Sequence, residues 1–193
     1  MNKFYITSSL PYTNSYPHIG FALEIIQTDV LARYRRQRGE DVFFLTGTDE
    51  HGIKVARTAQ ETGASPQEFT DQISDRFHEL TKALNISNND FIRTTDQKRH
   101  WPSVREVWGR LAENGDLEKR TYEGLYCAGC EAFITEKELV NGQCLIHQKK
   151  PEKVQEENWF FKLSKYAGQL KEKIETDELR IVPEGRKKEI LTL

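Results

Sequence analysis

The sequence predicts an α/β fold in which a parallel β-sheet is followed by a smaller lobe with a metal site. Predicted strands and helices alternate over residues 1–115, which is typical of a Rossmann-type sheet. Polar loops directly follow the first two strands, and all three cysteines fall within residues 127–144. We therefore expect residues 1–115 to form a Rossmann-type sheet domain and residues 116–193 to form a separate lobe.

The opening residues predict a strand, a helix and a second strand. Residues 3–9 alternate apolar and small polar side chains, and a turn-rich loop over residues 10–17 leads into a helix over residues 19–38. The helix carries an apolar stripe that we expect to face the core: Ile19, Ala22, Leu23, Ile26, Val30 and Tyr34. The next strand, at residues 41–45, contains four apolar residues in succession, which indicates a parallel strand covered on both faces.

Two more helices and a third strand follow. A helix is expected over residues 53–62, and the next helix opens with a capping box formed by Ser65 and Glu68 around Pro66. Its side chains that face the core are predicted from their spacing: Phe69, Ile73, Phe77, Leu80 and Leu84. Residues 91–93 predict the third strand.

The chain changes character near residue 115. Before it, residues 97–113 predict a helix with four inward side chains: Val104, Val107, Trp108 and Leu111. Beyond it, residues 121–148 predict short strands and turns. Residues 148–157 are charged and predict a solvated linker, and residues 158–175 predict a final helix.

The composition excludes some classes of function. The 28 basic and 30 acidic residues leave a net charge of -2, so bulk charge provides no general attraction to nucleic acid. The apolar runs are too short to cross a bilayer, and we expect a cytoplasmic protein with no membrane partner. Three cysteines within one segment argue against a disulfide framework and for a local metal site.

The loop between the first predicted strand and helix carries the most informative motif, residues 11–20. At the carboxyl end of a parallel strand, the N-terminus of the next helix offers free backbone N–H groups and a partial positive charge to a phosphate. Gly20 lets the backbone approach a nucleotide closely, because it has no Cβ. His18 can donate a hydrogen bond to charge that develops on a phosphoryl group.

Two sequence blocks resemble the signatures of class I aminoacyl-tRNA synthetases of the methionyl family. The first block, where the class signature reads His-Ile-Gly-His, consists of Leu10, Pro11, Tyr12, Asn14, His18, Ile19 and Gly20. The second block follows the second predicted strand and consists of Gly47, Thr48, Asp49, Glu50, His51 and Gly52. Because successive parallel strands end at the same edge of a sheet, the two blocks are expected to converge on one crevice.

The resemblance implies roles for individual residues. Leu10 and Tyr12 would line the pocket for the methionine side chain, and Asp49 would hold the α-ammonium group. Four residues would contact ATP: Tyr12, Asn14, His18 and Gly20. Of these, His18 and Gly20 would be catalytic. For Asp49, capping of the following helix is an alternative that can coexist with substrate binding.

Phe21 departs from the class signature, which ends in a second histidine. A phenylalanine donates no hydrogen bond to a phosphate, so we expect weaker ATP contacts at this position without loss of activity. His51, in the second block, is expected either behind the substrate contacts or in a structural role.

The cysteines and one histidine form a second constellation. Cys127, Cys130, Cys144 and His147 make a C-x2-C pair and a C-x2-H pair separated by thirteen residues. Thiolate and imidazole ligands suit a tetrahedral zinc ion, and four protein ligands make a closed, structural site. The alternative is three buried cysteines and a surface histidine without a metal. Residues 126–131 with Phe133 resemble the zinc knuckle in the connective insertion of methionyl-tRNA synthetases, which implies one zinc ion per chain.

Residues 162–165, Lys-Leu-Ser-Lys, superficially match the second class I signature, whose lysines stabilise the pyrophosphate leaving group. We reject this match, because the segment follows the knuckle and lies inside a predicted helix. Leu163 is expected in the core and the two lysines in solvent. Trp101, Trp108 and Trp159 lie on apolar stripes and are also expected in the core.

The resemblance implies an enzyme that uses ATP, accompanied by magnesium, to convert methionine to methionyl-adenylate and then transfers methionine to tRNA(Met). No leaving-group lysine loop or second catalytic half is found among the 193 residues, so we expect this chain alone to be inactive. Two alternatives remain open. One is another class I enzyme, such as a leucyl or cysteinyl synthetase or a nucleotidyl transferase, and the other is a zinc-ribbon binding module without catalysis.

Overall fold

The computed structural model describes residues 2–130 and 132–192, except for the side chain of Lys137. The chain divides into two compact units. The first consists of Met1–Glu106 and Leu125–Lys153, and the second of Val107–Gly124 and Val154–Leu193. The first unit contains the parallel sheet and the cysteine-rich hairpins, and the second contains the C-terminal helices.

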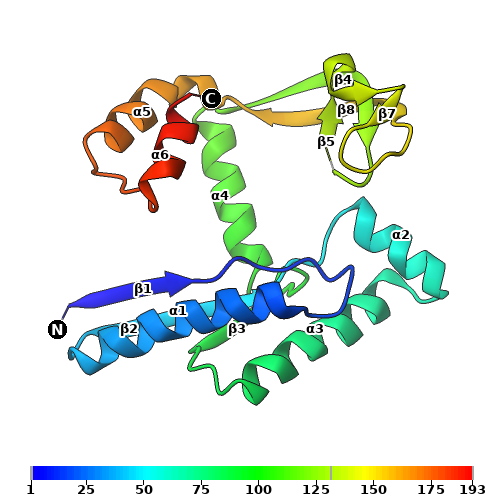
Figure 1. Ribbon diagram of the computed structural model, residues 1–193. Coiled ribbons are helices and arrows are strands. Elements are labelled where there is room, and N and C mark those ends of the chain that lie inside the picture. The colour runs from blue at the N-terminus through cyan, green and yellow to red at the C-terminus, as the bar shows by residue number, and fades with distance from the viewer. Residues whose placement is uncertain (1, 131, 193) are drawn as a thin grey trace. The chain divides into compact units, whose positions relative to one another are not determined.

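The first unit is built on a three-stranded parallel sheet with the strand order β1-β2-β3 (Figure 1). Its strands are β1 (Lys3–Thr7), β2 (Asp41–Thr48) and β3 (Asp90–Arg93). Its helices are α1 (Ile19–Gln37), α2 (Ile53–Thr62) and α3 (Pro66–Ala83). Along the chain, α1 lies between β1 and β2, and the other two helices lie between β2 and β3. The predicted α/β class and parallel sheet are therefore confirmed.

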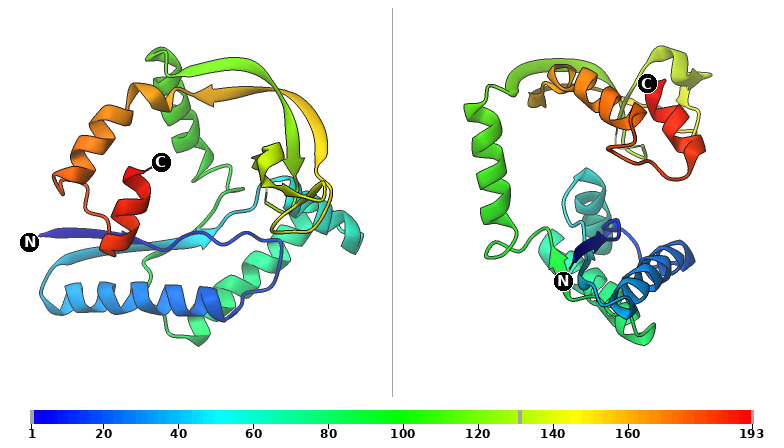
Figure 2. Two further views of the ribbon diagram at one scale, coloured as in Figure 1. Left: turned by 45° about the horizontal axis from the view of Figure 1, so that its top comes forward. Right: turned by 90° about the vertical axis from the view of Figure 1, so that its left-hand side faces the viewer.

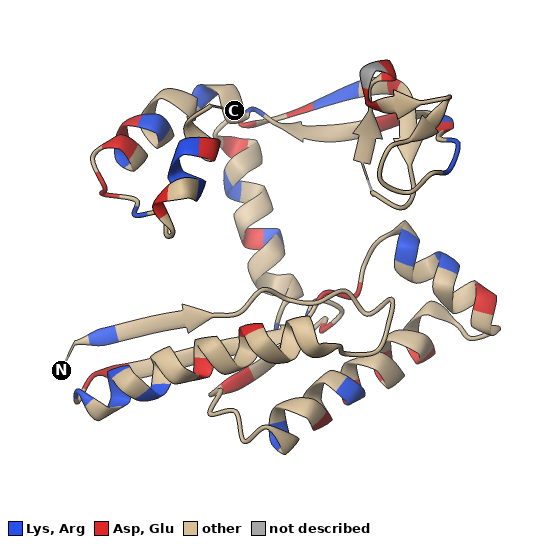
Figure 3. Ribbon diagram, in the orientation of Figure 1, with Lys and Arg blue, Asp and Glu red and all other residues tan. Residues whose placement is uncertain are grey.

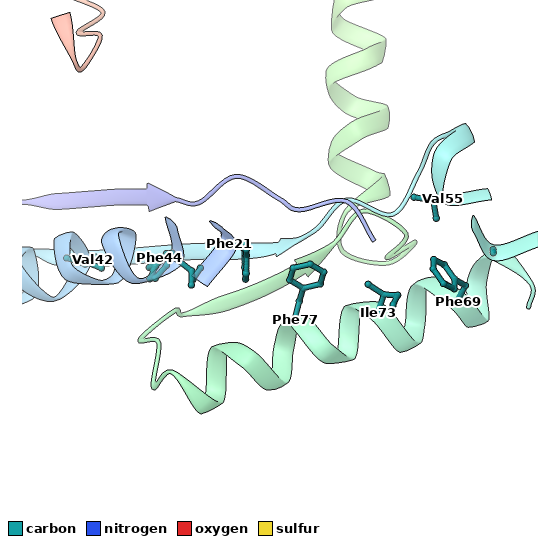
Figure 4. Packing of buried hydrophobic residues seen from close by; sticks show 10 residues of the cluster. Phe21, Val42, Phe44, Val55, Phe69, Ile73 and Phe77 are labelled. Carbon is teal, nitrogen blue, oxygen red and sulfur yellow. The ribbon is translucent and has the colours of Figure 1, made fainter. Parts of the chain in front are cut away.

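The hydrophobic core lies between the sheet and the helices, with α1 and α3 on the same side of the strands (Figure 2). Ten buried side chains form it: Phe21, Ile25, Ala32, Val42, Phe44, Val55, Ala59, Phe69, Ile73 and Phe77. The rings of Phe21 and Phe77 meet edge to face, with centroids 4.9 Å apart (Figure 4). Because such aromatic pairs add about 1 kcal/mol beyond their burial, Phe21 links the first turn of α1 firmly to α3.

Helix α3 begins and packs as its sequence predicts. The Ser65 hydroxyl accepts a hydrogen bond from Glu68 N at 3.3 Å, and the Glu68 carboxylate accepts one from Ser65 N at 3.1 Å. These two bonds complete the capping box. The predicted core residues are buried or partly buried: Phe69, Ile73, Phe77, Leu80 and Leu84.

Helix α1 buries a different face from the one that we predicted. In the expected stripe, Ile19, Leu23 and Val30 are 87%, 58% and 59% exposed. The buried face consists instead of Phe21, Ile25, Thr28, Asp29 and Ala32. Two of these side chains are polar, so apolar periodicity alone selected the wrong face.

Asp29 can be buried because hydrogen bonds satisfy its carboxylate. Its Oδ1 accepts bonds from the backbone N–H of Ser87 at 2.8 Å and from the Ser87 hydroxyl, and Arg33 donates to Oδ2 at 2.6 Å. Burial opposes ionisation, but the hydrogen bonds from Ser87 and Arg33 outweigh it and lower the pKa of Asp29. This network ties the loop after α3 to α1.

Strand β2 is covered on only one face by the residues that the structure describes. Val42 and Phe44 are buried, whereas Phe43 between them is 46% exposed and stacks on Tyr5 with ring centroids 6.1 Å apart. The expectation of cover on both faces is therefore wrong for this chain. A short apolar run indicates a strand without determining how many of its faces are covered.

The segment after the sheet forms short antiparallel strands in the order β5-β4-β8 and a separate β6-β7 ribbon. The bounds are β4 Leu117–Cys127, β5 Ala132–Ile134, η1 Glu136–Glu138, β6 Leu139–Val140, β7 Gln143–Cys144 and β8 Glu152–Phe161. Two expectations are wrong here: residues 152–157 are not a solvated linker, and residues 158–161 do not begin a helix. Pairing with β4 makes this charged segment a strand, and the partner is distant in the sequence.

The remaining helices are α4 (Trp101–Glu113), η2 (Leu163–Lys165), α5 (Ala167–Glu175) and α6 (Glu184–Leu191). Helix α4 begins at Trp101 and not at residue 97, because the Asp96 carboxylate accepts hydrogen bonds from two backbone N–H groups and forms a turn there. No helix in the described part of the chain is both long and apolar enough to cross a membrane.

Three of the four expected core positions in α4 are wrong, and the fourth, Leu111, is partly buried. Val104 and Val107 are 46% and 57% exposed. Trp108 and Trp159 are also exposed, and they contact each other edge to face with ring centroids 5.9 Å apart. Trp101 is partly buried, and its indole N–H donates to the backbone oxygen of Thr94 at 3.1 Å.

Residues 162–165 have a structural role in the second unit. The buried Asp116 carboxylate accepts hydrogen bonds from Lys165 Nζ at 2.5 Å and from the Tyr166 hydroxyl at 2.6 Å. These hydrogen bonds lower the pKa of the Asp116 carboxyl, and the bond from Lys165 has the largest effect. Lys165 is thus exposed as expected and is also paired, whereas Leu163 is 57% exposed and not in the core as expected.

Gly47, near the end of β2, lies where the backbone of β3 approaches most closely. A Cβ on Gly47 would lie 1.8 Å from the backbone oxygen of Ile92. No side chain fits without displacing β3, which explains why the second sequence block opens with glycine.

We expect Gly47→Ala to lower the free energy of unfolding by at least about 2 kcal/mol, because the added methyl group overlaps the backbone of Ile92. Urea unfolding followed by circular dichroism measures the change. At Gly109 an added Cβ meets nothing within 4 Å. Gly109→Ala is thus the control and should leave stability unchanged or raise it by about 1 kcal/mol. Equal stability of Gly47→Ala and the parent chain would contradict the close approach.

Candidate functional site

The two sequence blocks meet beyond the carboxyl ends of β1 and β2. Thr13 N donates to the backbone oxygen of Asp49 at 3.0 Å, and Asp49 N donates to the backbone oxygen of Pro11 at 2.9 Å. These bonds form an isolated parallel bridge between Tyr12 and Asp49. The structure thus brings the blocks together at the edge of the sheet where parallel folds bind ligands.

A hollow of about 300 Å³ opens beside the first block. It is lined by Ser9, Pro11, Tyr12, Asn14, Ser15, His18, Gly20, Phe21, Glu24 and Phe77. The four residues expected to contact ATP, namely Tyr12, Asn14, His18 and Gly20, are all among them. Leu10 and Asp49 are partly buried and do not line this hollow. The hollow therefore corresponds to the expected ATP side of the site.

His18 is the N-cap residue of α1. Its Nδ1 accepts a hydrogen bond from Gly20 N at 3.0 Å, and the side chain is exposed. A Cβ on Gly20 would lie 2.8 Å from Cε1 of His18, so glycine at this position makes room for the imidazole. The spacing of the motif therefore fixes the ring and leaves Nε2 available as a donor.

Phe21, where the class signature has a second histidine, is a core residue. It is 5% exposed and packs on Phe77, as described above. Its aromatic edge reaches the lining of the hollow without offering a polar group. The substitution therefore strengthens the packing under the site.

Glu24 is a residue of the site that the sequence did not reveal. Its carboxylate accepts hydrogen bonds from Ser9 N at 2.6 Å and from the Ser9 hydroxyl at 2.7 Å. These bonds tie the chain leaving β1 to the second turn of α1, at the rim of the hollow. An acidic residue on an exposed helix turn is common, so no sequence pattern marked Glu24.

Glu50 forms a buried ion pair next to Asp49. Its side chain is 0% exposed, and it accepts hydrogen bonds from Arg93 Nε at 2.7 Å and from the second Arg93 nitrogen at 2.9 Å. The hydrogen bonds that Arg93 donates to Glu50 raise the pKa of the Arg93 guanidinium above its ordinary value. Neither residue was among the predicted site residues.

The alternative role for Asp49 as a helix cap is wrong. Gly52 is the N-cap residue of α2, and no side chain caps this helix. The Asp49 carboxylate instead accepts a long hydrogen bond of 3.5 Å from the Thr94 hydroxyl. It therefore has unused acceptor capacity.

His51 points to a different hollow. Its Nε2 lies 3.2 Å from the backbone oxygen of Thr94. The hollow has a volume of about 430 Å³ and is lined by His51, Thr94, His100, Trp101, Val104 and Arg105. His51 thus lies outside the hollow that His18 lines.

The four predicted metal ligands converge in the cysteine-rich part of the first unit. Their ligand atoms all lie within 4.8 Å of one another: Cys127, Cys130, Cys144 and His147. The Cys130 sulfur lies 3.2 Å from Nδ1 of His147 and 3.5 Å from the Cys144 sulfur. The cluster can hold a metal ion. Glu131, at the end of the expected knuckle segment, lies outside the described residues.

The surroundings of the cluster favour a thiolate at Cys144. Hydrogen bonds lower the pKa of the Cys144 thiol to about 6, and the bond from the backbone N–H of His147 has the largest effect. The neighbouring Cys144 raises the pKa of Cys130. A Cβ on Gly129 would lie 2.5 Å from the His147 ring, so glycine is required between the first two cysteines.

Acidic and basic side chains are interspersed over the helices of the first unit (Figure 3). On α1 the basic residues gather toward the C-terminal end of the helix (Figure 3).

Comparison with known proteins gives one consistent grouping. The family model described as tRNA synthetases class I (M) matches residues 4–144 and 134–192. The methionine–tRNA ligase of Thermotoga maritima is 46% identical over 195 residues, which covers 99% of this chain and 31% of the relative. That of Clostridium tetani is 47% identical over 193 residues, covering 99% of this chain and 30% of the relative. The chain thus spans less than a third of the length of these relatives.

Solved structures agree with this grouping. Mycobacterium tuberculosis methionyl-tRNA synthetase in complex with methionyl-adenylate is similar with a TM-score of 0.92 and 38% identity, over 100% of this chain and 38% of that protein. The Agrobacterium radiobacter K84 agnB2 LeuRS in a ternary complex with tRNA and LeuAMS has a TM-score of 0.73 and 21% identity. The second likeness covers 91% of this chain and 23% of that protein, and it concerns the fold alone.

We expect the neutral form of His18 to carry its proton on Nε2, because Nδ1 already accepts the hydrogen bond from Gly20 N. Nitrogen-15 NMR of the imidazole in alkaline solution, where histidines are neutral, distinguishes the two tautomers. A His18→Ala sample identifies the signal by its loss. Protonation of Nδ1 would contradict the N-cap geometry.

Proposed function

The chain belongs to the methionyl (M) family of class I tRNA synthetases, and from this premise we propose that it forms part of an enzyme that activates methionine with ATP and transfers it to tRNA(Met). The observation that carries the proposal is the meeting of the two signature blocks at the bridge between Tyr12 and Asp49, beside the hollow that contains His18. The proposal concerns the activity of a whole enzyme, of which this chain matches about 30% of the relatives' length.

The proposed reaction has two steps. The methionine carboxylate attacks the α-phosphate of ATP, which forms methionyl-adenylate and releases pyrophosphate. A ribose hydroxyl at the end of the tRNA then displaces AMP. Neither step needs a covalent protein nucleophile, so the protein contributes alignment and hydrogen-bond donors, with magnesium accompanying ATP.

The hollow beside α1 would take ATP. Helix α1 has no acidic residue in its first turn, so the partial positive charge of its N-terminus is not offset there. His18, held through Nδ1, would donate from Nε2 to the reacting phosphate. Tyr12, Asn14 and Gly20 line the same hollow and would contact the nucleotide.

The methionine side of the proposed site would lie on the Asp49 side of the bridge. The Asp49 carboxylate has acceptor capacity for the α-ammonium group. Leu10 and Tyr12 flank Pro11, whose backbone oxygen accepts the hydrogen bond from Asp49 N. Their side chains would contact the apolar part of methionine.

We further propose that the metal is zinc and that its role is structural. Three thiolates and one imidazole form the donor set that zinc prefers, and four protein ligands leave no open position for a substrate. The site would fold the lobe around it.

For the chain as a whole, we propose that residues 1–115 form the first half of the Rossmann catalytic domain and residues 116–193 the connective insertion with its zinc knuckle. A cytoplasmic location follows from a role in translation. The second candidate function is that of a metal-binding module without catalysis. The convergence of the four ligands supports it. The two candidates differ in their need for methionine and ATP.

We expect the full-length gene product to catalyse methionine-dependent exchange of pyrophosphate into ATP. Replacing His18 by alanine should lower kcat about a hundredfold, because a donor to the transition state is lost. Leucine and cysteine in place of methionine serve as controls for the related synthetases. Exchange that is absent, or equally fast with leucine, would refute the assignment.

We expect about one zinc ion per chain in protein purified without chelators, because four ligands converge on one point. Elemental analysis measures the content. Cys130→Ser should lose the metal and lower the thermal midpoint of the lobe. Replacing the exposed Leu145 by serine, a position between two of the ligands, should change neither quantity. Metal-free parent protein would contradict the zinc assignment and leave the catalytic one intact.

A further inference from the structure

We propose that Glu50 and Arg93 are positioning residues, which set the orientation of the Asp49 carboxylate toward the amino group of the substrate through the hydroxyl of Thr94. The inference rests on the proposed function, because it concerns the residue assigned to the α-ammonium group. It goes further because it gives a role to Glu50, Arg93 and Thr94, to which the proposed function assigns none.

The Glu50 carboxylate is fixed in one orientation. It is wholly buried and accepts the two hydrogen bonds from Arg93 described above. The Thr48 hydroxyl donates to Oε1 at 2.6 Å, and the Thr95 hydroxyl donates to Oε2. With donors on both oxygens, the side chain cannot rotate without breaking charged hydrogen bonds.

Thr94 connects this fixed group to Asp49. Its hydroxyl oxygen accepts a hydrogen bond from Glu50 N at 2.8 Å. The single hydroxyl proton then donates to Oδ1 of Asp49 at 3.5 Å. Because a hydroxyl has only one proton, the bond accepted from Glu50 N determines where that proton points. The other carboxylate oxygen of Asp49 is left for a substrate cation.

Arg93 joins three elements at this point. It is the last residue of β3, in register with Thr48 at the end of β2, and its Nη2 also donates to the Asp71 carboxylate of α3 at 2.5 Å. Arg93 thereby connects the ends of two strands to a helix.

Fold stability alone does not account for this arrangement. A buried ion pair contributes little net stability compared with apolar side chains of the same volume, because both charges lose their hydration. The benefit of such an ion pair is that it holds the neighbouring backbone in one geometry. Here the neighbour is Asp49, which directly precedes Glu50. The network is therefore suited to orienting Asp49.

The test uses pyrophosphate exchange by the full-length gene product, with KM for methionine and for ATP measured separately. Thr94→Val removes the hydroxyl at similar volume and should raise the KM for methionine about fivefold to tenfold, as expected for one hydrogen bond to a charged group. The KM for ATP should change less than about twofold. Thr94→Ser retains the hydroxyl and should restore the KM for methionine.

Two further variants separate positioning from general loss of stability. Arg93→Lys keeps the charge but loses the paired hydrogen bonds to Glu50, and it should raise the KM for methionine in the same way as Thr94→Val. Asp29→Asn disturbs the buried network with Ser87, away from the site, and should lower the thermal midpoint without changing that KM.

The outcomes distinguish the two proposals. No exchange by the unmodified enzyme would overturn the proposed function itself. Normal exchange by the unmodified enzyme, with an unchanged KM for methionine in Thr94→Val and Arg93→Lys, would overturn the positioning role alone. An equal rise in Asp29→Asn would also overturn it, since the effect would then come from lower stability.

Discussion

The parallel pairing of β1 with β2 is the constraint on which the rest of the site depends. The regular ladder ends at Thr7 and Leu45, and beyond a short gap two backbone hydrogen bonds between Asp49 and the residues on either side of Tyr12 resume the pairing. Because both strands run in the same direction, the loops that follow them leave the sheet at the same edge. Residues far apart in the sequence, such as His18 and Asp49, are thereby held in one neighbourhood.

Buried carboxylates fix the loops around this frame. Asp29 anchors the loop after α3, Glu50 joins the ends of β2 and β3, and Asp116 anchors residues 162–165 in the second unit. Each carboxylate is buried with charged or hydroxyl donors, so none is left unsatisfied. Polar networks of this kind specify one arrangement of loops, whereas apolar packing tolerates several. The site is thus rigid where its loops would otherwise be free to move.

The cysteine-rich lobe is organised on a different principle. Among the residues that the structure describes, its core contains three buried side chains, Cys127, Ile134 and Cys144, and two of these are candidate metal ligands. Such a small apolar core cannot offset the conformational entropy of ordering the hairpins. Four ligand atoms converge within 4.8 Å at this point, and a metal ion held by them would cross-link the hairpins. The sheet is ordered by hydrophobic burial, whereas the cysteine-rich part carries a cluster that can hold a metal ion.

The sequence by itself determined the features that depend on local chemistry. It predicted the alternation of strands and helices around a parallel sheet, the capping box at Ser65 and the four clustered ligands. Only the tertiary structure decided which face of α1 is buried and that residues 152–161 form a strand. It also decided that Glu50 pairs with Arg93, forty-three positions away. The physical reason is that motifs and caps are set by neighbouring residues, whereas burial, strand pairing and buried ion pairs depend on partners that the fold alone supplies.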